Sequence, residues 1–221
     1  MEIVPGVHDI RVIGATVHLL VEDELTLIDA GRRGSGAHVA RYIETLGRPM
    51  SDLTRIVCTH GHPDHIGGVA EIVAASGATV HMHPADAERL RIGVRDVLAR
   101  PSPGPLIALL TRPLSDPQPI GEGDVLPPLG GLRVIHTPGH TPGSVCLYAP
   151  ARRILFSGDA LQFRRGRLSR PHLIFSDDMA EARRSVARLA ALEVDVICFG
   201  HYAPLRSGVG GALHELLESW A

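Results

Sequence analysis

The chain has 221 residues, enough to bury one substantial core, and its 44% hydrophobic and 21% charged residues are typical of a globular protein. A formal net charge of −2 provides no general attraction for nucleic acid or an anionic membrane. No apolar run approaches the roughly 18 residues of a membrane-spanning helix, and the N-terminus has no signal-peptide pattern. We therefore expect a single domain over residues 1–221, located in the cytoplasm, without nucleic-acid or membrane partners.

The cysteines favour the same location. Cys58, Cys146 and Cys198 each lie within an apolar run, where free thiols are commonly buried. They are too few and too widely spaced for a disulfide scaffold. We expect three buried thiols in a reducing compartment.

Patterns of apolar residues predict both strands and helices in the first half of the chain. Residues 10–21 and 24–29 are predicted as the two strands of a hairpin with an acidic turn, Glu22-Asp23-Glu24. A helix from Ser35 to Leu46 is expected to end at Gly47. The other elements expected before residue 92 are a strand at 55–58, a helix at 65–75 capped by Asp64, a strand at 78–82 and a helix at 84–91.

Repeated prolines distinguish residues 92–120, which we expect to form a partly helical insertion over one face of the protein. The strand pattern then returns. The elements expected after the insertion are strands at 124–126, 132–136, 144–149, 153–157 and 194–199 and helices at 178–192 and 208–219. Because the order of elements is similar in the two halves, we expect an α/β protein with two mixed sheets facing each other and helices outside.

The densest group of metal-binding side chains lies at residues 58–65, which read Cys-Thr-His-Gly-His-Pro-Asp-His. Four candidates fall between a predicted strand and a predicted helix, which together can hold a loop in shape. They are His60, His62, Asp64 and His65. Neutral imidazole together with carboxylate suits zinc and its first-row neighbours better than calcium or magnesium. A solvated turn or an affinity tag, the alternative, does not fit an internal segment with these flanks.

Three further candidates each follow a predicted strand and lie beside glycine. They are His140 in Thr-Pro-Gly-His, Asp159 in Ser-Gly-Asp and His201 in Phe-Gly-His. Taken singly, each also fits an ordinary turn, cap or loop residue. Their recurrence at strand ends, together with the cluster at 60–65, favours a metal site.

The order His60-x-His62-x-Asp64-His65, followed by His140, Asp159 and His201, resembles the pattern of the metallo-β-lactamase superfamily. The segment Leu-Ile-Asp-Ala-Gly around Asp29 is similar to an early motif of that family. The resemblance covers about residues 10 to 202. It implies a four-layer αβ/βα sandwich with a site along the edge where the two sheets meet, and it makes the 92–120 insertion a candidate cover for that active site.

The resemblance also implies the ligands of two divalent metal ions per chain. One metal would take His60, His62 and His140, and the other would take Asp64, His65 and His201. Asp159 would bridge the two, and Asp29 would orient ligands through hydrogen bonds. Zinc is the expected metal, with iron and manganese as alternatives.

Two metals that share a water lower its pKa and give hydroxide near neutral pH. The resemblance therefore implies a binuclear metallo-hydrolase in which a metal-bridging hydroxide attacks a carbonyl. Asp64 is the expected catalytic residue, because a ligand carboxylate can also orient the nucleophile or relay its proton.

The site residues favour one branch of the family. Asp159 stands where many true β-lactamases have cysteine, so the chain is more similar to the glyoxalase II, lactonase and phosphodiesterase branches. We expect the glutathione-binding helical domain of glyoxalase II to be missing, because His201 is followed only by residues 202–221. Gln162 and Phe163 follow Asp159 where many acyl-homoserine lactonases have tyrosine. The expected substrate is a small ester, thioester or lactone.

Candidate substrate contacts lie near these ligands. Arg164 and Arg165 belong to a local basic excess that could clamp a substrate carboxylate, although a solvated loop is the alternative. Tyr202 could offer a phenol beside His201, with a surface tyrosine as the alternative. His172, in a loop expected at 160–177, is the last candidate.

Two other functions stay open. One is a mononuclear iron enzyme similar to the persulfide dioxygenases, which resemble this family and keep much of the same ligand set. The other is a non-catalytic metal-binding protein on the same fold. A small-molecule substrate is the expected partner, and both a monomer and a homodimer are compatible with the sequence.

Overall fold

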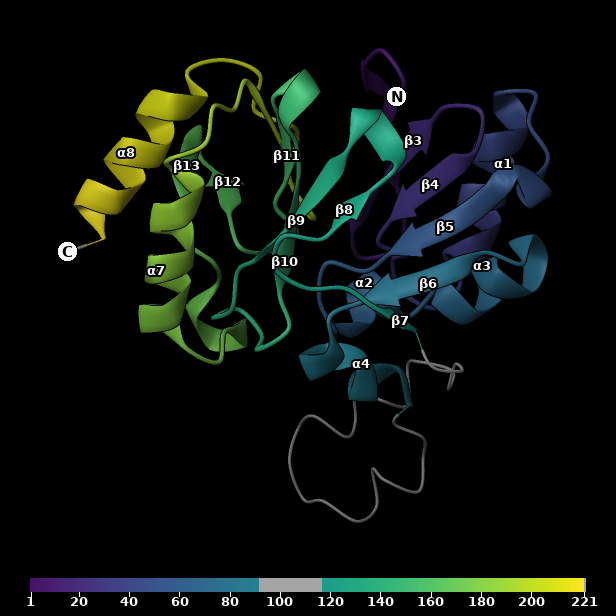
Figure 1. Ribbon diagram of the computed structural model, residues 1–221, viewed down its shortest axis with the longest axis horizontal. Helices are drawn as coiled ribbons and strands as arrows, with labels where there is room; N and C mark the ends of the chain where they lie inside the picture. The colour runs from purple at the N-terminus through teal and green to yellow at the C-terminus, as the bar shows by residue number, and fades with distance from the viewer. Residues whose placement is uncertain (92–116, 221) are drawn as a thin grey trace. The chain divides into compact units, whose positions relative to one another are not determined.

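The computed structural model describes residues 1–91 and 117–220, so most of the expected insertion at 92–120 lies outside the described residues. The chain contains two compact units, Met1–Pro119 and Ile120–Ala221. Each has its own sheet and its own helices (Figure 1). The expectation that residues 1–221 form one domain stays a prediction.

The first unit is built on a seven-stranded mixed sheet with its strands in sequence order. The strands are β1 (Glu2–Val4), β2 (Val7–Arg11), β3 (Thr16–Val21), β4 (Leu25–Ile28), β5 (Leu53–Val57), β6 (Thr79–Met82) and β7 (Gln118–Pro119). Neighbouring strands are antiparallel from β1 to β4 and parallel from β4 to β7. The change matters because parallel neighbours need crossover connections. The loops that begin these connections all start at the carboxyl ends of the parallel strands, on the same side of the sheet.

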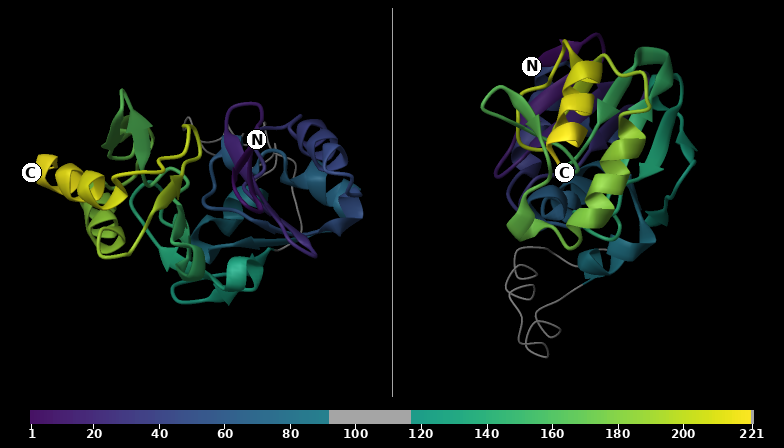
Figure 2. Two further views of the ribbon diagram at one scale, coloured as in Figure 1. Left: turned by 90° about the horizontal axis from the view of Figure 1, so that it is seen from above. Right: turned by 90° about the vertical axis from the view of Figure 1, so that its left-hand side faces the viewer.

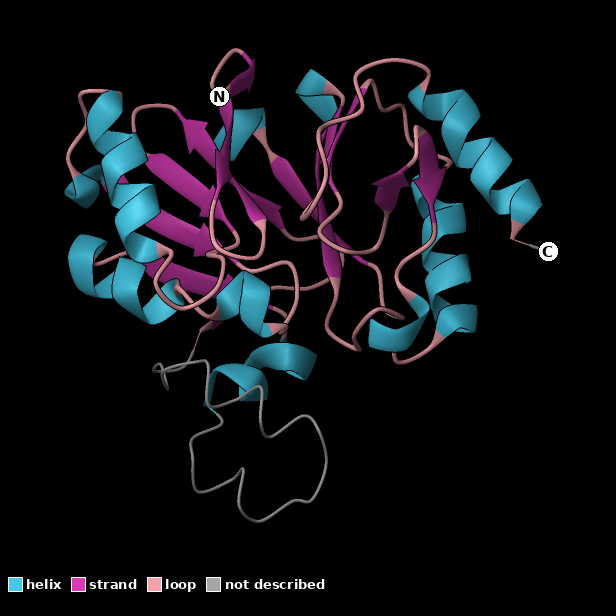
Figure 3. Ribbon diagram, turned by 180° about the vertical axis from the view of Figure 1, so that it is seen from behind, coloured by secondary structure: helices cyan, strands magenta, loops and turns pink. Residues whose placement is uncertain are grey.

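Helices supply these crossovers. They are α1 (Gly36–Thr45) with the 3-10 turn Met50–Asp52, then α2 (Pro63–Ile66), α3 (Val69–Ser76) and α4 (Pro84–Arg91). Figure 3 shows α1 and α3 lying side by side on one face of the sheet. Val39 and Ile43 of α1 and Ile72 of α3 are fully or almost fully buried and belong to one apolar cluster with the strands. This packing fixes the end of β5, from which the loop with the predicted ligands His60, His62, Asp64 and His65 starts.

The first unit corrects three predictions. Residues 10–21 are not one strand, because the chain turns at 12–15 between β2 and β3. The helix expected at 65–75 is two helices, α2 and α3. Asp64 does not cap α2: His62 is its N-cap residue and Pro63 its first residue. Proline is favoured at that position since its fixed φ suits a helix start, and it places Asp64 inside the first turn.

The other predicted elements of this unit are confirmed, with ends that shift by a few residues. The chain also forms two strands that the sequence did not predict, β1 and, at the opposite edge of the sheet, β7. Strand β7 has two residues, one of them Pro119, and proline cannot donate a hydrogen bond to a neighbouring strand.

The second unit contains a five-stranded mixed sheet in the order β14-β11-β10-β9-β8. The strands are β8 (Val125–Leu126), β9 (Leu132–His136), β10 (Val145–Ala149), β11 (Ile154–Phe156) and β14 (Val196–Cys198). Helices α7 (Met179–Leu189) and α8 (Val209–Ser219) and the 3-10 turns Pro128–Gly130, Pro150–Arg152 and Leu173–Phe175 complete the unit. Every strand and helix predicted after residue 120 is confirmed.

The two helices of this unit share one apolar core with its sheet. Val186 and Leu189 of α7 pack in the same cluster as Leu213 of α8, and the strands contribute Leu155 and Ile197. All five side chains have no exposed surface. The core fixes α7 against the sheet, which matters because the first turn of α7 contacts a predicted metal-binding loop.

The segment expected as a loop at 160–177 contains a hairpin, which corrects the prediction. Strands β12 (Gln162–Arg164) and β13 (Arg167–Ser169) pair antiparallel beside α8 (Figure 2). Arg165 and Gly166 both have positive φ, 53° and 77°, as the tight two-residue turn of a hairpin requires. Each of these strands has three residues and one apolar side chain, Phe163 or Leu168, which is too short a run for periodicity to indicate a strand.

All three cysteines are free and buried, as predicted. Burial raises the pKa of the Cys146 thiol to about 12 and moves the pKa of the Cys58 thiol well above its usual value. Both therefore stay protonated at neutral pH and act as small apolar side chains.

Among residues 1–91 and 117–220, the structure contains no helix with the length and hydropathy needed to cross a bilayer.

The N-caps of α7 and α1 generate a stability prediction. Asp178 accepts hydrogen bonds from the backbone amides of Ala180 and Glu181, at 2.8 and 2.9 Å. Ser35, at the start of α1, makes no such bond, and its buried hydroxyl has no hydrogen-bond partner among the described residues. Asp178→Ala should lower the free energy of unfolding by about 1 kcal/mol, whereas Ser35→Ala should cost less. Urea unfolding measures both, and equal losses would contradict the capping role.

Candidate metal centre

The first cluster lies in the loop between β5 and α2. His60 and His65 are buried, with relative exposures of 1% and 0%. The His60 ring is 4.8 Å from the His62 ring and 4.1 Å from the His65 ring, measured between centroids. A carboxylate oxygen of Asp64 and a ring nitrogen of His65 lie within 4.8 Å of each other. Thus the loop gathers the four residues that the sequence predicted as ligands.

Asp29 holds this loop from the end of β4. Its carboxylate accepts hydrogen bonds from the backbone amide and the hydroxyl of Thr59 and from Nδ1 of His65, each at 2.8 Å. The residue is 1% exposed and has a positive φ of 61°. Asp29 is therefore hydrogen-bonded to His65, one of the predicted ligands, and its role in orienting ligands stays a prediction.

Thr59 extends this hydrogen bonding to a second histidine. Its hydroxyl lies 3.0 Å from Nδ1 of His60. The Thr59 hydroxyl has one proton and donates it in the hydrogen bond to the Asp29 carboxylate, which can only accept. In the other hydrogen bond the Thr59 oxygen is therefore the acceptor and the N–H group at Nδ1 of His60 is the donor. In their neutral forms His60 and His65 then both carry the proton on Nδ1 and the lone pair on Nε2. A metal-binding histidine requires this arrangement when its Nε2 is the ligand atom.

The loop after β4, which carries Asp29, approaches the segment that follows His65 closely because that segment contains Gly68. The amide of Ala30 donates to the carbonyl of His65 at 2.7 Å, and the amide of Gly68 donates to the carbonyl of Gly31 at 2.9 Å. A Cβ atom on Gly68 would overlap with the carbonyl oxygen of Ala30. The absence of a side chain at this position thus allows Asp29 to reach the metal-binding loop.

A second buried carboxylate holds the loop from the opposite end. Asp86 in α4 is 0% exposed and accepts a hydrogen bond from the amide of Gly61 at 2.7 Å. Gly61 lies between His60 and His62. Sequence reasoning missed both Asp86 and Thr59. An acidic residue in the first turn of a helix is usually a solvated partner of the helix dipole, so its type and position gave no sign of burial.

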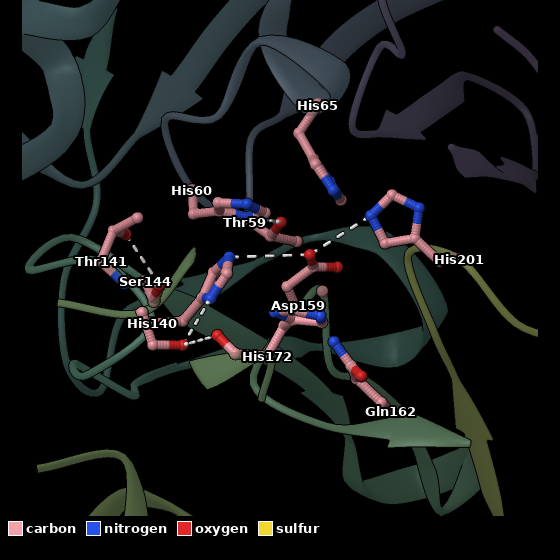
Figure 4. Close-up of polar contacts among 12 residues, drawn as sticks. Thr59, His60, His65, His140, Thr141, Ser144, Asp159, Gln162, His172 and His201 are labelled. Atoms are coloured by element: carbon pink, nitrogen blue, oxygen red, sulfur yellow. Dashed lines mark hydrogen bonds and ion pairs between the residues drawn. The ribbon is translucent and has the colours of Figure 1, made fainter. Parts of the chain in front are cut away.

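The second cluster comes from three strand ends of the other unit. His140 follows β9, Asp159 follows β11 and His201 follows β14. Figure 4 shows Asp159 between the two histidines. Its Oδ2 atom is 3.6 Å from Nε2 of His140 and 3.2 Å from Nε2 of His201. The structure therefore brings together the three predicted ligands of this unit, with both Nε2 atoms near one carboxylate oxygen.

The loop that carries His140 is fixed against α7. The amide of Asp178 donates to the carbonyl of Gly139 at 2.9 Å, and the hydroxyl of Ser185 donates to the carbonyl of Pro138 at 2.8 Å. A Cβ atom on Gly139 would overlap with the backbone of Ala182. Gly139 also has a φ of 131°, which a residue with a side chain rarely adopts.

The predicted substrate contacts also lie in this unit. Arg164 and Arg165 are exposed around the hairpin turn, and neither forms an ion pair within the described part of the chain. Tyr202 is partly buried, with its hydroxyl 3.5 Å from Oε1 of Gln162. The His172 ring packs against Phe175 at a centroid distance of 4.8 Å. Their roles in substrate binding stay predictions.

The donor sets fit a divalent metal. The first unit offers three imidazoles and a carboxylate, and the second offers two imidazoles and a carboxylate. Nitrogen and oxygen donors of these types suit zinc and neighbouring metals. The hydrogen bonds on Nδ1 of His60 and His65 are those that commonly orient metal-binding histidines.

Comparison with known proteins identifies the family. Residues 11–201 match the metallo-beta-lactamase superfamily. The chain belongs to that superfamily. The match includes all of the predicted ligands and Asp29, so the predicted family is confirmed.

Individual relatives match two thirds of this chain or more. A probable metallo-hydrolase, YflN of Bacillus subtilis (strain 168), is 30% identical over 230 residues, which cover 92% of this chain and 86% of that protein. A hydroxyacylglutathione hydrolase of Fuscovulum blasticum is 37% identical over 151 residues, which cover 67% of this chain but only 48% of that enzyme. The chain thus corresponds to about half of the latter protein.

A solved structure supports the fold. A metallo-beta-lactamase family protein from Thermus thermophilus has a TM-score of 0.78 at 24% identity, covering 99% of this chain and 80% of that one. The predicted α/β metallo-β-lactamase fold, with two mixed sheets and flanking helices, is therefore confirmed.

The close approach at Gly68 generates a second stability prediction. Gly68→Ala should lower the free energy of unfolding by about 1–3 kcal/mol, because the new methyl group forces the loops apart. Gly211→Ala is a matched control in α8, where a Cβ atom would meet nothing within 4 Å. It should stabilise the protein by about 0.5–1 kcal/mol, since alanine favours helix more than glycine does. Similar unfolding curves for the two variants would contradict this explanation of Gly68.

Thr59 generates a prediction about metal binding. Thr59→Val keeps the shape of the side chain but removes the hydroxyl between Asp29 and His60, so it should weaken zinc binding about 10–100-fold. Thr59→Ser keeps the hydroxyl and should stay within about 3-fold of the wild type, since the hydrogen bonds are retained. Competition with a chromophoric chelator measures both values, and unchanged binding by Thr59→Val would show that the hydroxyl does not orient His60.

Proposed function

We propose that this protein is a metal-dependent hydrolase that cleaves a small ester, thioester or lactone. The observation that carries the proposal is the set of hydrogen bonds on Nδ1 of His60 and His65, which puts the lone pair of each ring on Nε2. Residues held in this way suit a metal site better than a solvated turn. Membership of the metallo-beta-lactamase superfamily supports the same interpretation.

The proposed ligands follow the order of motifs within the family match. One metal takes His60, His62 and His140, the other takes Asp64, His65 and His201, and Asp159 is shared. Support for the shared role comes from the second unit, where one oxygen of Asp159 lies within 3.6 Å of Nε2 of His140 and 3.2 Å of Nε2 of His201. A carboxylate with one oxygen close to two histidines that bind different metals can itself bind both metals.

Divalent metals bound to these residues would supply the Lewis acidity that makes water a nucleophile near neutral pH. The protein supplies position and proton transfer. Asp64 lies in the first turn of α2, next to buried His65, and one of its two carboxylate oxygens is enough for a metal. We assign to the other oxygen the transfer of a proton from the attacking water to the leaving group, a role that a carboxylate can perform.

The substrate class rests on the relatives. Proteins named hydroxyacylglutathione hydrolase are 37% and 35% identical to this chain over 151 and 178 residues. The name describes hydrolysis of a glutathione thioester, so thioesters are the first substrates to test. The chain covers only 48% and 58% of those two enzymes. Esters and lactones therefore stay candidate substrates beside thioesters, and we do not propose glutathione as the leaving group. The buried free thiols support a cytoplasmic location.

The proposal predicts two zinc ions per chain and a catalytic loss when Asp64 changes. Asp64→Asn keeps an oxygen ligand but removes the proton acceptor, so kcat on the best substrate should fall about 100–10,000-fold while much of the metal remains. Asp64→Ala should lose metal as well as activity. Asp23→Ala, in the exposed turn between β3 and β4, is the control and should match the wild type.

Metal analysis and a panel of esters, thioesters, lactones and phosphodiesters test this proposal. A protein that binds two metals but cleaves nothing on the panel would point to the non-catalytic alternative. One iron per chain, with oxygen consumption in the presence of glutathione persulfide, would replace hydrolysis by the dioxygenase alternative.

A further inference from the structure

The second unit contains a hydrogen-bonded connection to His140 that no sequence motif indicated. Nδ1 of His140 lies 3.1 Å from the hydroxyl oxygen of Ser176. The same hydroxyl lies 2.8 Å from the carbonyl oxygen of His172. His140 is 1% exposed, so water has little access to this nitrogen.

The direction of both hydrogen bonds follows from the chemistry of the groups. A backbone carbonyl only accepts, and a serine hydroxyl has one proton to give. The Ser176 hydroxyl therefore donates its hydrogen bond to the His172 carbonyl. The Ser176 oxygen accepts a hydrogen bond from the N–H group at Nδ1 of His140. The distances agree, since O–H···O bonds are typically about 0.2 Å shorter than N–H···O bonds.

The His172 carbonyl, which accepts the hydrogen bond from Ser176, is itself held by the backbone around it. His172 precedes the 3-10 turn Leu173–Phe175, and its carbonyl also accepts the amide of Phe175 at 3.1 Å. The segment is joined to His140 a second time, because the amide of Asp177 donates to the His140 carbonyl at 3.2 Å. Ser176 thus contacts the ring of His140 while its neighbour holds the backbone of the same residue.

We infer that Ser176, oriented by the carbonyl of His172, is a positioning residue that holds neutral His140 in the tautomer with the proton on Nδ1, leaving Nε2 to bind metal. The inference rests on the proposed function in assigning His140 to a metal. It gives Ser176 the role in the second unit that Asp29 and Thr59 have in the first. His172, predicted as a substrate contact, acts here through its backbone.

Spectra of the metal-free protein test the tautomer directly. Protein labelled with ¹⁵N-histidine, studied above the pKa of histidine, gives long-range ¹H–¹⁵N spectra that distinguish protonated from unprotonated ring nitrogens. The His140 signals are assigned from their loss in His140→Gln. We expect a protonated Nδ1 in the wild type and a mixture of tautomers in Ser176→Ala. A proton on Nε2 of wild-type His140 would overturn the inference, whatever the activity of the protein.

Metal affinity tests the consequence. Ser176→Ala should weaken zinc binding about 10–100-fold in chelator competition, and Ser176→Thr, which keeps the hydroxyl, should restore most of it. Ser144→Ala is the matched control. The hydroxyl of Ser144 accepts the amide of Thr141 at 3.0 Å and lies 2.8 Å from the Thr141 hydroxyl, so it supports the His140 loop through Thr141. Its zinc affinity should stay within about 3-fold of the wild type.

The outcomes separate the inference from the proposed function. Equal losses in Ser176→Ala and Ser144→Ala, or no loss in either, would show that Ser176 has no special role, although the hydrolase proposal would stand. A wild-type protein that binds no zinc, iron or manganese would overturn the proposed function and with it the metal-binding part of the inference.

Discussion

In three buried histidines of the two clusters, His60, His65 and His140, Nδ1 is hydrogen-bonded to a neighbouring side chain, and the arrangement of both loops depends on these contacts. In the first unit Asp29 makes this contact with His65 directly and with His60 through Thr59. In the second unit Ser176 makes it with His140. The partners differ in chemistry, a carboxylate in one unit and a hydroxyl bonded to a carbonyl in the other. The result is the same, because each ring carries its proton on Nδ1 and presents Nε2.

These contacts require the backbone to approach more closely than side chains usually allow. Gly68 lies against Ala30, and Gly139 lies against the first turn of α7. Each glycine is next to a loop that carries ligands, and each allows a second segment to reach that loop. Both loops are attached to elements of an apolar core, so the geometry of the ligands depends on packing several residues away.

Local patterns in the sequence predicted much of this arrangement. Apolar periodicity placed most strands and helices, and the recurrence of histidine, aspartate and glycine at strand ends identified the ligand candidates. The errors have local causes. Helix α2 begins at Pro63, one residue before Asp64, and each strand of the β12–β13 hairpin has only one apolar residue, too few to show a period. Thr59, Asp86 and Ser176 could not be found in this way, because their roles arise from contacts formed only in the folded chain.

The 3-10 turn Leu173–Phe175 consists of exposed residues and lies between two residues that are held by hydrogen bonds, His172 and Ser176. At its ends, the His172 carbonyl and the Ser176 hydroxyl are fixed by hydrogen bonds. Between them, Leu173, Ile174 and Phe175 are 62%, 81% and 61% exposed. These three side chains contribute little to the core, so protein engineers could randomise them at small cost in folding. Such a library would vary the surface near His140 while leaving the hydrogen bonds that hold its ring unchanged.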